Sequence, residues 1–483
     1  MPLQRLLAVL CFLVAVTACD GPSPESGSPP GEGGADLSAE DVAFLDDLQR
    51  RTFDFFWETT NPANGLVPDR WPTESFSSVA AVGFGLTAYG VGAERGWVTR
   101  AEAAERVRTT LRFLADAPMG PERRGVSGHR GFYYHFLDME TGERFQTVEL
   151  STIDTALLLA GVLFAQEYFD AEGPVESEIR ALADSLYLRV EWPFFQTDER
   201  GITMAWHPEP DRGFSPARWT GYDESILLHV LALGSPTHPA GPEIWDHYTS
   251  GYEWGEFYGY EHLNFPPLFG HQYSHIWIDF RGIRDDFMRE KGIDYFENSR
   301  RATLAQREYA AENPDGWRGF GSDRWGLTAS DGPKDTTVVI DGVERTFRQY
   351  WARGASLQDV RNDGTLVPTA AGGSIPFAPE ETVAALRSMR EAYGDDLYAR
   401  YGFRDAYNPT FAAAGIAPVK GEVVEDVAWF DNDYLGIDQG PIVLMIENHR
   451  SGLIWDVMRD NPYIVRGLCR AGFRGGWLEG RCE

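Results

Sequence analysis

Residues 152–169, TIDTALLLAGVLFAQEYF, decide the fold, because this stretch is apolar on nearly every side of the helix that it predicts. A helix that is hydrophobic all round is buried, whereas a helix with one polar face lies on the outside of a protein. The helices predicted on either side of it, at 100–117 and 175–192, are amphipathic. An outer helix, a buried helix and a second outer helix therefore follow one another along the chain.

The same alternation continues through most of the sequence. Further apolar helices are predicted at 77–92, 222–234 and 439–457, and further amphipathic helices at 39–59, 292–312 and 379–398. Helices within 242–255, 272–284 and 365–375 would complete six pairs. We therefore predict an all-α fold, an (α/α)6 toroid of alternating inner and outer helices.

One segment departs from this pattern. Around 337–349, alternating residues flank Asp341 and Gly342, and Asp-Gly between two such runs is a strong hairpin signal. We expect a small β-hairpin insertion there.

Composition excludes some classes of partner. The chain has 483 residues, a formal net charge of -30, and 15 Trp, 20 Tyr and 29 Phe. Nucleic-acid binding depends on patches of Lys and Arg, so this balance argues against it. Most of the aromatic residues fit a bulky core, but many stand in polar, glycine-rich loops, as the walls of a sugar-binding cleft do. We expect a monomer.

The N-terminus predicts export and a lipid anchor. Residues 1–18 contain Arg5 and then a short apolar run that is typical of a cleaved signal peptide. VTAC at 16–19 resembles a bacterial lipobox, which implies lipidation of Cys19; a plain secretory signal is the alternative. Residues 19–37 are rich in Pro, Gly, Ser and acids and fit a disordered tether. We place the protein in the bacterial cell envelope, with the periplasmic side of the inner membrane favoured over the outer membrane.

The remainder, 38–483, reads as one catalytic domain. It retains Cys469 and Cys482, and export to an oxidising compartment favours a disulfide that closes the C-terminal tail. Two unpaired thiols are the alternative.

In such a toroid, every inner helix runs the same way, so the starts of the inner helices gather at one end. The segments that lead into them should line one cavity. These segments are 70–78, 145–154, 218–224, 269–275, 372–381 and 429–438.

Carboxylates dominate these segments. Glycoside hydrolysis uses two of them, one to protonate the leaving oxygen and one to activate water or attack the sugar. The acids are Glu149, Asp154, Asp223, Glu224, Asp431, Asp433 and Asp438.

Acids at a helix start also satisfy free N–H groups, so each acid has a second explanation. Asp154, three residues after Ser151, fits a capping acid and a catalytic acid equally well. Glu224 is harder to explain as a cap, because the aromatic and apolar residues around it can raise its pKa toward that of a general acid. We predict Glu224 as the proton donor, with Asp438 holding a water across the cavity, and Asp154 and Glu149 as further catalytic candidates.

Other residues of these segments are substrate-binding candidates. Trp71, Trp219 and Trp325 are predicted sugar platforms, and Arg281 fits either sugar hydroxyls or neighbouring acids. His271 and His275 share a helix spacing, but Gln272 stands where a zinc-protease motif requires Glu, so we predict polar cleft residues and no metal. The complete set of binding candidates is Trp71, Trp219, Tyr222, His271, Gln272, His275, Arg281, Trp325, Asp431 and Gln439.

Three longer stretches resemble the bacterial glucoamylase-like proteins, in particular glycoside hydrolase family 144, the β-1,2-glucanases. They are GYDESILLHVLALGSPTHP (221–239), PLFGHQYSHIWIDFRGI (267–283) and YLGIDQGPIVLMIENHRSGLIWDVM (434–458). GFYYHFLDMETGERF and VELSTIDTALLLAG extend the match, which covers about 40–475.

The resemblance implies an (α/α)6 fold and hydrolysis of β-1,2-glucan with inversion and without metal or cofactor. Family members act in the endo mode or in an exo mode that releases sophorose. The acids that match are Asp154 with Glu149, Glu224, and the group at 431–438. A related segment of cyclic β-1,2-glucan synthases transfers glycosyl groups instead.

Two other readings stay open. A non-catalytic envelope lipoprotein that captures oligosaccharides would bind glucan without turnover, although binding alone does not need several acids. A polysaccharide lyase would give an unsaturated product that absorbs ultraviolet light, and the histidines at 271 and 275 keep this reading open.

Overall fold

The structure is a computed structural model, and it describes residues 37–197 and 201–482. The predicted signal peptide, the lipidation site Cys19 and the tether up to residue 36 lie outside the described residues. From Leu37 onward the chain forms one compact unit.

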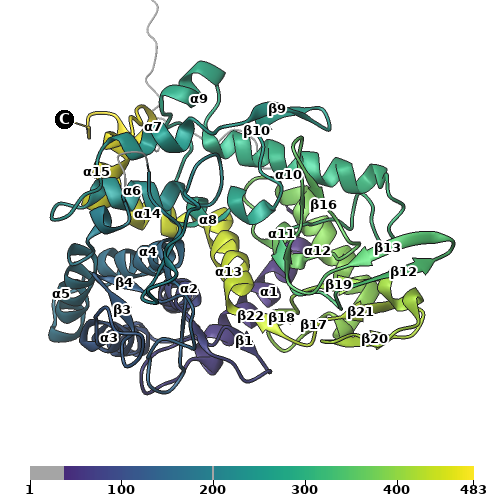
Figure 1. Ribbon diagram of the computed structural model, residues 1–483, viewed down its shortest axis with the longest axis horizontal. Coiled ribbons are helices and arrows are strands. Elements are labelled where there is room, and N and C mark those ends of the chain that lie inside the picture. Colours follow the sequence, from purple (N-terminus) through teal and green to yellow (C-terminus); the bar gives the residue numbers. More distant parts are fainter. Residues whose placement is uncertain (1–36, 198–200, 483) are drawn as a thin grey trace, which may run out of the picture. The chain divides into compact units, whose positions relative to one another are not determined.

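Helices are the main regular structure of this unit (Figure 1). The long ones are α1 (Ala39–Thr59), α2 (Val79–Glu94), α3 (Arg100–Asp116), α4 (Thr152–Tyr168), α5 (Pro174–Leu188), α10 (Tyr295–Glu312), α12 (Pro379–Tyr393) and α13 (Gly436–Arg450). The short ones are α6 (Ile226–Gly234), α7 (Glu243–Thr249), α8 (Tyr273–Trp277), α9 (Asp286–Lys291), α11 (Pro368–Gly372), α14 (Leu453–Arg459) and α15 (Pro462–Arg470).

The predicted apolar helices form the interior. Helix α2 packs against α4 and α13, and these three lie side by side in Figure 1. Nearly all residues of α2 and α4 are buried, as their sequences predict. Glycines allow the close crossing of these two helices, because a Cβ on Gly83 would lie 2.3 Å from the carbonyl oxygen of Leu157, and one on Gly161 2.1 Å from that of Gly83.

The predicted amphipathic helices bury only one face. Helices α1, α3 and α5 each have an exposed charged side, and α3 packs against α5. Capping boxes open two of them: Ser38 with Asp41 at α1, and Thr99 with Glu102 at α3. Side-chain burial in the structure therefore follows the alternation that was read from the sequence.

The three windows in which further helices were expected do contain them. They hold α7, α8 and α11. Two boundaries differ from the expectation. Helix α6 starts at Ile226 rather than at 222, and the segment 372–381 follows the buried helix α11 instead of leading into it.

The strands are short and form sheets of two or three strands. They are β1 (Arg70–Trp71), β2 (Ser77–Ser78), β3 (Gly128–His129), β4 (Phe132–Tyr133), β5 (Phe136–Leu137), β6 (Leu150–Ser151), β7 (Ala205–His207), β8 (Gly213–Phe214), β9 (Trp254–Phe257), β10 (Tyr260–Leu263), β11 (Ala329–Ser330), β12 (Thr336–Ile340), β13 (Val343–Phe347), β14 (Trp351–Ala352), β15 (Gly354–Ala355), β16 (Val360–Arg361), β17 (Tyr398–Ala399), β18 (Gly402–Phe403), β19 (Tyr407–Asn408), β20 (Glu422–Val424), β21 (Ala428–Phe430) and β22 (Tyr434–Leu435).

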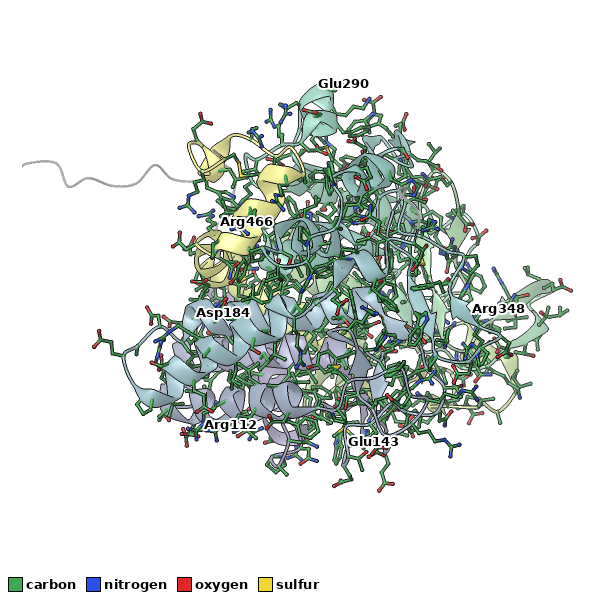
Figure 2. All side chains as sticks on the ribbon, turned by 60° about the vertical axis from the view of Figure 1, so that its left-hand side comes forward. Arg112, Glu143, Asp184, Glu290, Arg348 and Arg466 are labelled. Carbon is green, nitrogen blue, oxygen red and sulfur yellow. A yellow bond between two sulfur atoms is a disulfide. The ribbon has the colours of Figure 1, made fainter. Side chains whose placement is uncertain are left out.

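Strands β12 and β13 pair antiparallel as a hairpin, with Asp341 and Gly342 at positive φ in the turn. We call residues 328–364, which carry this hairpin and the strands next to it, the insertion. Figure 2 shows Arg348 of the insertion beside the hairpin, and Arg466 of α15 on the opposite side of the view.

The C-terminal tail is tied to α15 by a disulfide between Cys469 and Cys482. Among the described residues, no helix is long and apolar enough to cross a membrane.

Candidate active site

Acidic side chains from three different helix starts meet around one tyrosine. Asp154 stands in the first turn of α4, Glu224 just before α6, and Asp438 in the first turn of α13. Burial raises the pKa of Tyr273, at the start of α8, and the charges of Asp438, Glu224 and Asp154 raise it further. The three acids therefore lie within electrostatic reach of one hydroxyl group. We call these three acids together with Glu149 the acid site.

Glu224 is held by its backbone and leaves its carboxyl group free of the helix. Its carbonyl oxygen accepts a hydrogen bond from Ser274 Oγ at 2.7 Å. The neighbouring Asp223 accepts from the backbone N–H and the hydroxyl of Ser225, at 2.9 and 2.6 Å, and so stabilises this turn. Burial raises the pKa of Glu224 well above its usual value, and Asp223 and Asp154 raise it further. A raised pKa of this kind suits a carboxyl group to the role of general acid.

Asp154 is bound on two sides. Its Oδ2 atom accepts a hydrogen bond from the hydroxyl of Ser151, the N-cap of α4, at 2.5 Å. Its Oδ1 atom lies 3.4 Å from Nε2 of His135, whose Nδ1 lies 2.8 Å from Oε1 of Glu149. The imidazole ring thus bridges the two acids. Asp154 binds the N-cap residue of α4 and also belongs to the acid site.

The charges of this bridge support one another. Burial lowers the pKa of His135, but Asp154 and Glu149 outweigh it and bring the pKa to about 9. Burial likewise raises the pKa of Glu149, but the hydrogen bond and charge of His135 lower it to about 2. The ring is therefore an imidazolium at neutral pH. Sequence reasoning missed His135, because it lies in the short loop between β4 and β5 with no recognisable spacing to either acid.

Asp438 forms a carboxyl pair that the sequence did not predict. Burial raises the pKa of Asp438 to about 7, and it raises the pKa of Asp405 well above its usual value. Each of the two side chains acts on the pKa of the other, so they lie close enough to share one proton. Asp405 lies outside every predicted lead-in segment of the sequence, so no sequence signal pointed to it.

Further aspartates surround this pair. Oxygen atoms of Asp331, Asp405 and Asp431 lie within 4.8 Å of one another, a spacing that a cation can bridge. Arg70 and Lys420 both bind Asp331, with Arg70 Nη1 at 2.6 Å, and so bring two positive charges to the cluster. We assign no metal to it. Asp431, a predicted binding residue, is fully buried here and belongs to this cluster.

Two large aromatic side chains near the acids are exposed. Trp71, a predicted platform, is 40% exposed on β1, which pairs with β22 directly before α13. Tyr350 of the insertion, which was not predicted, is 59% exposed. Trp219 is buried instead, and its Nε1 donates to Thr152 Oγ1 at the start of α4, so it supports the wall of the site.

Several predicted binding residues lie buried in the structure. They are Tyr222, His271, Gln272, His275, Trp325 and Gln439, each at most 4% exposed. Gln272 donates to the carbonyl of Ala370 and to Ser374 Oγ, which ties α8 to the segment of α11. The His275 ring packs against Phe280 and Phe377.

The physical reason is that α8 is short and enclosed by aromatic side chains. Tyr273 at its start lies near the acids and Ser274 binds the backbone of Glu224, while Gln272 binds a buried backbone carbonyl. Arg281, also a binding candidate, makes two side-chain hydrogen bonds to Asp279 and lies over Trp455. Of its two predicted roles, the structure shows the pairing with a neighbouring acid.

Comparison with known proteins gives a family match. The model described as "Glycoamylase: Putative glucoamylase" matches residues 216–462. An exo β-1,2-glucooligosaccharide sophorohydrolase (non-reducing end) from Parabacteroides distasonis is 28% identical over 94% of this chain. The chain spans 61% of that relative's length.

Two solved structures are similar over almost the whole chain. A structure from Bacteroides uniformis, described as a "putative glucoamylase", is 31% identical with a TM-score of 0.77, and the match covers 92% of this chain and 100% of that one. An endo-β-1,2-glucanase from Chitinophaga pinensis, solved with sophorotriose and glucose, is 27% identical with a TM-score of 0.75 and the same two coverages.

Proposed function

Because the chain belongs to the Glycoamylase family of glucoamylase-like proteins, we propose that it is a glycoside hydrolase that cleaves β-1,2-glucan. The observation that carries the proposal is the carboxyl group of Glu224, whose pKa is raised by burial and which shares its surroundings with Asp438 and Asp154. The named activities of the relatives support the choice of linkage.

The reaction uses two carboxyl groups in different states. Glu224 donates its proton to the glycosidic oxygen as the bond to the anomeric carbon breaks. Asp438 accepts a proton from the water that attacks this carbon from the opposite face, which inverts its configuration. No metal or cofactor is needed for these steps.

Each environment suits the role of its acid. The apolar surroundings of Glu224 keep it protonated, whereas Asp438 shares a proton with Asp405 and can lose its own as pH rises past about 7. His135 keeps Glu149 ionised and holds Asp154 in place. Asp154 in turn raises the pKa of Glu224 further.

Trp71 is proposed to contact substrate because it is exposed beside the strand that leads to Asp438. Whether the enzyme cuts inside chains or releases sophorose from an end depends on how far the binding groove extends. The size of the first products distinguishes the two modes.

The closed toroid, the monomeric state and the lipid anchor are further proposals. We propose that six helix pairs form a closed toroid, which the buried helices α2, α4 and α13 and the amphipathic α1, α3 and α5 support. We propose a monomer that Cys19 anchors by a lipid to the bacterial envelope, on the periplasmic side of the inner membrane rather than in the outer membrane. The sequence of residues 1–37 supports the anchor.

The test is release of reducing ends from linear β-1,2-glucan by the purified protein. Activity on β-1,2-glucan, with little on β-1,3-glucan or starch, is expected. Cleavage of another glucan but not of this one would contradict the substrate. Binding without turnover would instead indicate a capture protein.

A further inference from the structure

Tyr350 is an exposed aromatic side chain that the fold does not use. It is 59% exposed, and within residues 37–197 and 201–482 its ring makes no aromatic contact and its hydroxyl no hydrogen bond. An exposed tyrosine on an ordinary surface needs no explanation. The exposure of Tyr350 does need an explanation, because a buried ion pair holds the loop that carries it.

Arg353 holds the backbone of that loop in place. It is fully buried, and its guanidinium binds both carboxylate oxygens of Asp363 at 2.7 and 2.8 Å. Its other N–H groups donate to the carbonyl oxygens of Arg348, Gln349 and Trp351, at 3.3, 3.1 and 3.3 Å. The backbone is therefore held on both sides of the exposed tyrosine.

Burying this ion pair costs free energy, because two charges leave water and the attraction between them only partly offsets the loss of hydration. The N–H donors of the Arg353 guanidinium nevertheless fix the geometry of the backbone that they bind. The side chain whose position they fix is that of Tyr350, which is 59% exposed.

The loop presents this side chain to the acids. In the β11–β14 ladder, Ser330 pairs with Trp351, so the next position places Asp331 opposite Tyr350. The backbone N–H of Asp331 donates to Asp405 Oδ2 at 2.8 Å. Asp438, the partner of Asp405, acts electrostatically on the tyrosine hydroxyl together with both aspartates.

We propose that Tyr350 is a substrate-binding residue whose ring and hydroxyl contact the glucosyl unit held next to Asp438, and that Arg353 with Asp363 positions it. An exposed aromatic ring covers the C–H face of a sugar, and its hydroxyl reaches a sugar hydroxyl. The inference rests on the proposed function for the identity of the sugar, but it concerns binding rather than bond cleavage.

Calorimetric titration of sophorotriose into the full-length protein tests it. Each variant carries Glu224→Gln, so that turnover does not consume the ligand. Tyr350→Ala is expected to weaken binding at least 10-fold, and Tyr350→Phe, which loses only the hydroxyl, about 2- to 10-fold. Val339→Ala is the matched control, because Val339 is 70% exposed on the same insertion but belongs to the hairpin.

The outcomes separate the two proposals. Binding of sophorotriose that Tyr350→Ala and Tyr350→Phe leave unchanged would overturn the inference alone. If the parent protein does not bind sophorotriose at all, both the inference and the proposed substrate fail. Thermal melting of Tyr350→Ala is expected to match that of the Val339→Ala control, since neither side chain is packed.

Discussion

Nε2 of His135 lies 3.4 Å from Oδ1 of Asp154, so a charged imidazole ring connects the loop between β4 and β5 to the start of the buried helix α4. The other ring nitrogen binds Glu149. The bridge orders two of the acids around the proposed reaction centre without taking part in bond cleavage.

The contribution of this bridge to stability should depend on pH. The pKa of His135 is raised to about 9, so its contribution is full below its unfolded value near 6.5 and is lost as pH rises through about 9. The pKa of Glu149 is lowered to about 2, so its contribution is present above about 4.5 and is lost as pH falls through about 2.

We therefore expect His135→Gln to lower the melting temperature most between about pH 4.5 and 6.5, and least above pH 9. Thermal melts of the unmodified protein and of His135→Gln, from about pH 4.5 to above pH 9, check this expectation. A constant difference from pH 5 to pH 10 would show that the ring is not charged in the folded protein. His238→Gln is a control, because His238 lies on a surface turn outside the acid site.

Removing the proposed proton donor should abolish most activity. Glu224→Gln keeps the size of the side chain but cannot give up a proton, so kcat should fall by about 10²- to 10⁴-fold. Steady-state kinetics on β-1,2-glucan measure this, with the exposed acid Glu143 changed to Gln as the control. Near-normal turnover of Glu224→Gln would remove it from the role of acid.

The rate should depend on pH with two limbs. Asp438, whose pKa is raised to about 7, must lose its proton to act as base, so kcat/KM should rise as pH approaches about 7. That apparent value belongs to the Asp405–Asp438 pair rather than to one residue. Loss of the Glu224 proton should lower the rate at higher pH. A rate that is independent of pH between 5 and 9 would contradict both assignments.

The buried ion pair of the insertion predicts a large loss of stability. Asp363→Ala leaves the guanidinium of Arg353 buried and unpaired, which should cost about 3–5 kcal/mol. The control is Asp359→Ala, because Asp359 pairs with Arg361 on the surface of the same insertion and such pairs contribute about 0–1 kcal/mol. Chemical denaturation compares the two, and equal losses would show that the buried pair is not structural.

The sequence predicted the layering of helices because burial on all sides is visible in a single segment. The apolar run of α4 needs no knowledge of its neighbours, and Glu224 could be selected because it precedes such a run. His135, Asp405 and Tyr350 could not, since each reaches the site through a loop whose position depends on distant parts of the chain. The burial of His271, His275 and Trp325 could not be predicted either, because a polar or aromatic residue in a glycine-rich stretch looks the same whether it faces a cavity or fills the core.

The most direct test of the central claim is proton NMR of linear β-1,2-glucan during the first minutes after the protein is added. The account predicts that new reducing ends appear first as the α-anomer and that Glu224→Gln produces none. Absence of new reducing ends, or their first appearance as the β-anomer, would contradict an inverting β-1,2-glucanase that uses Glu224 and Asp438.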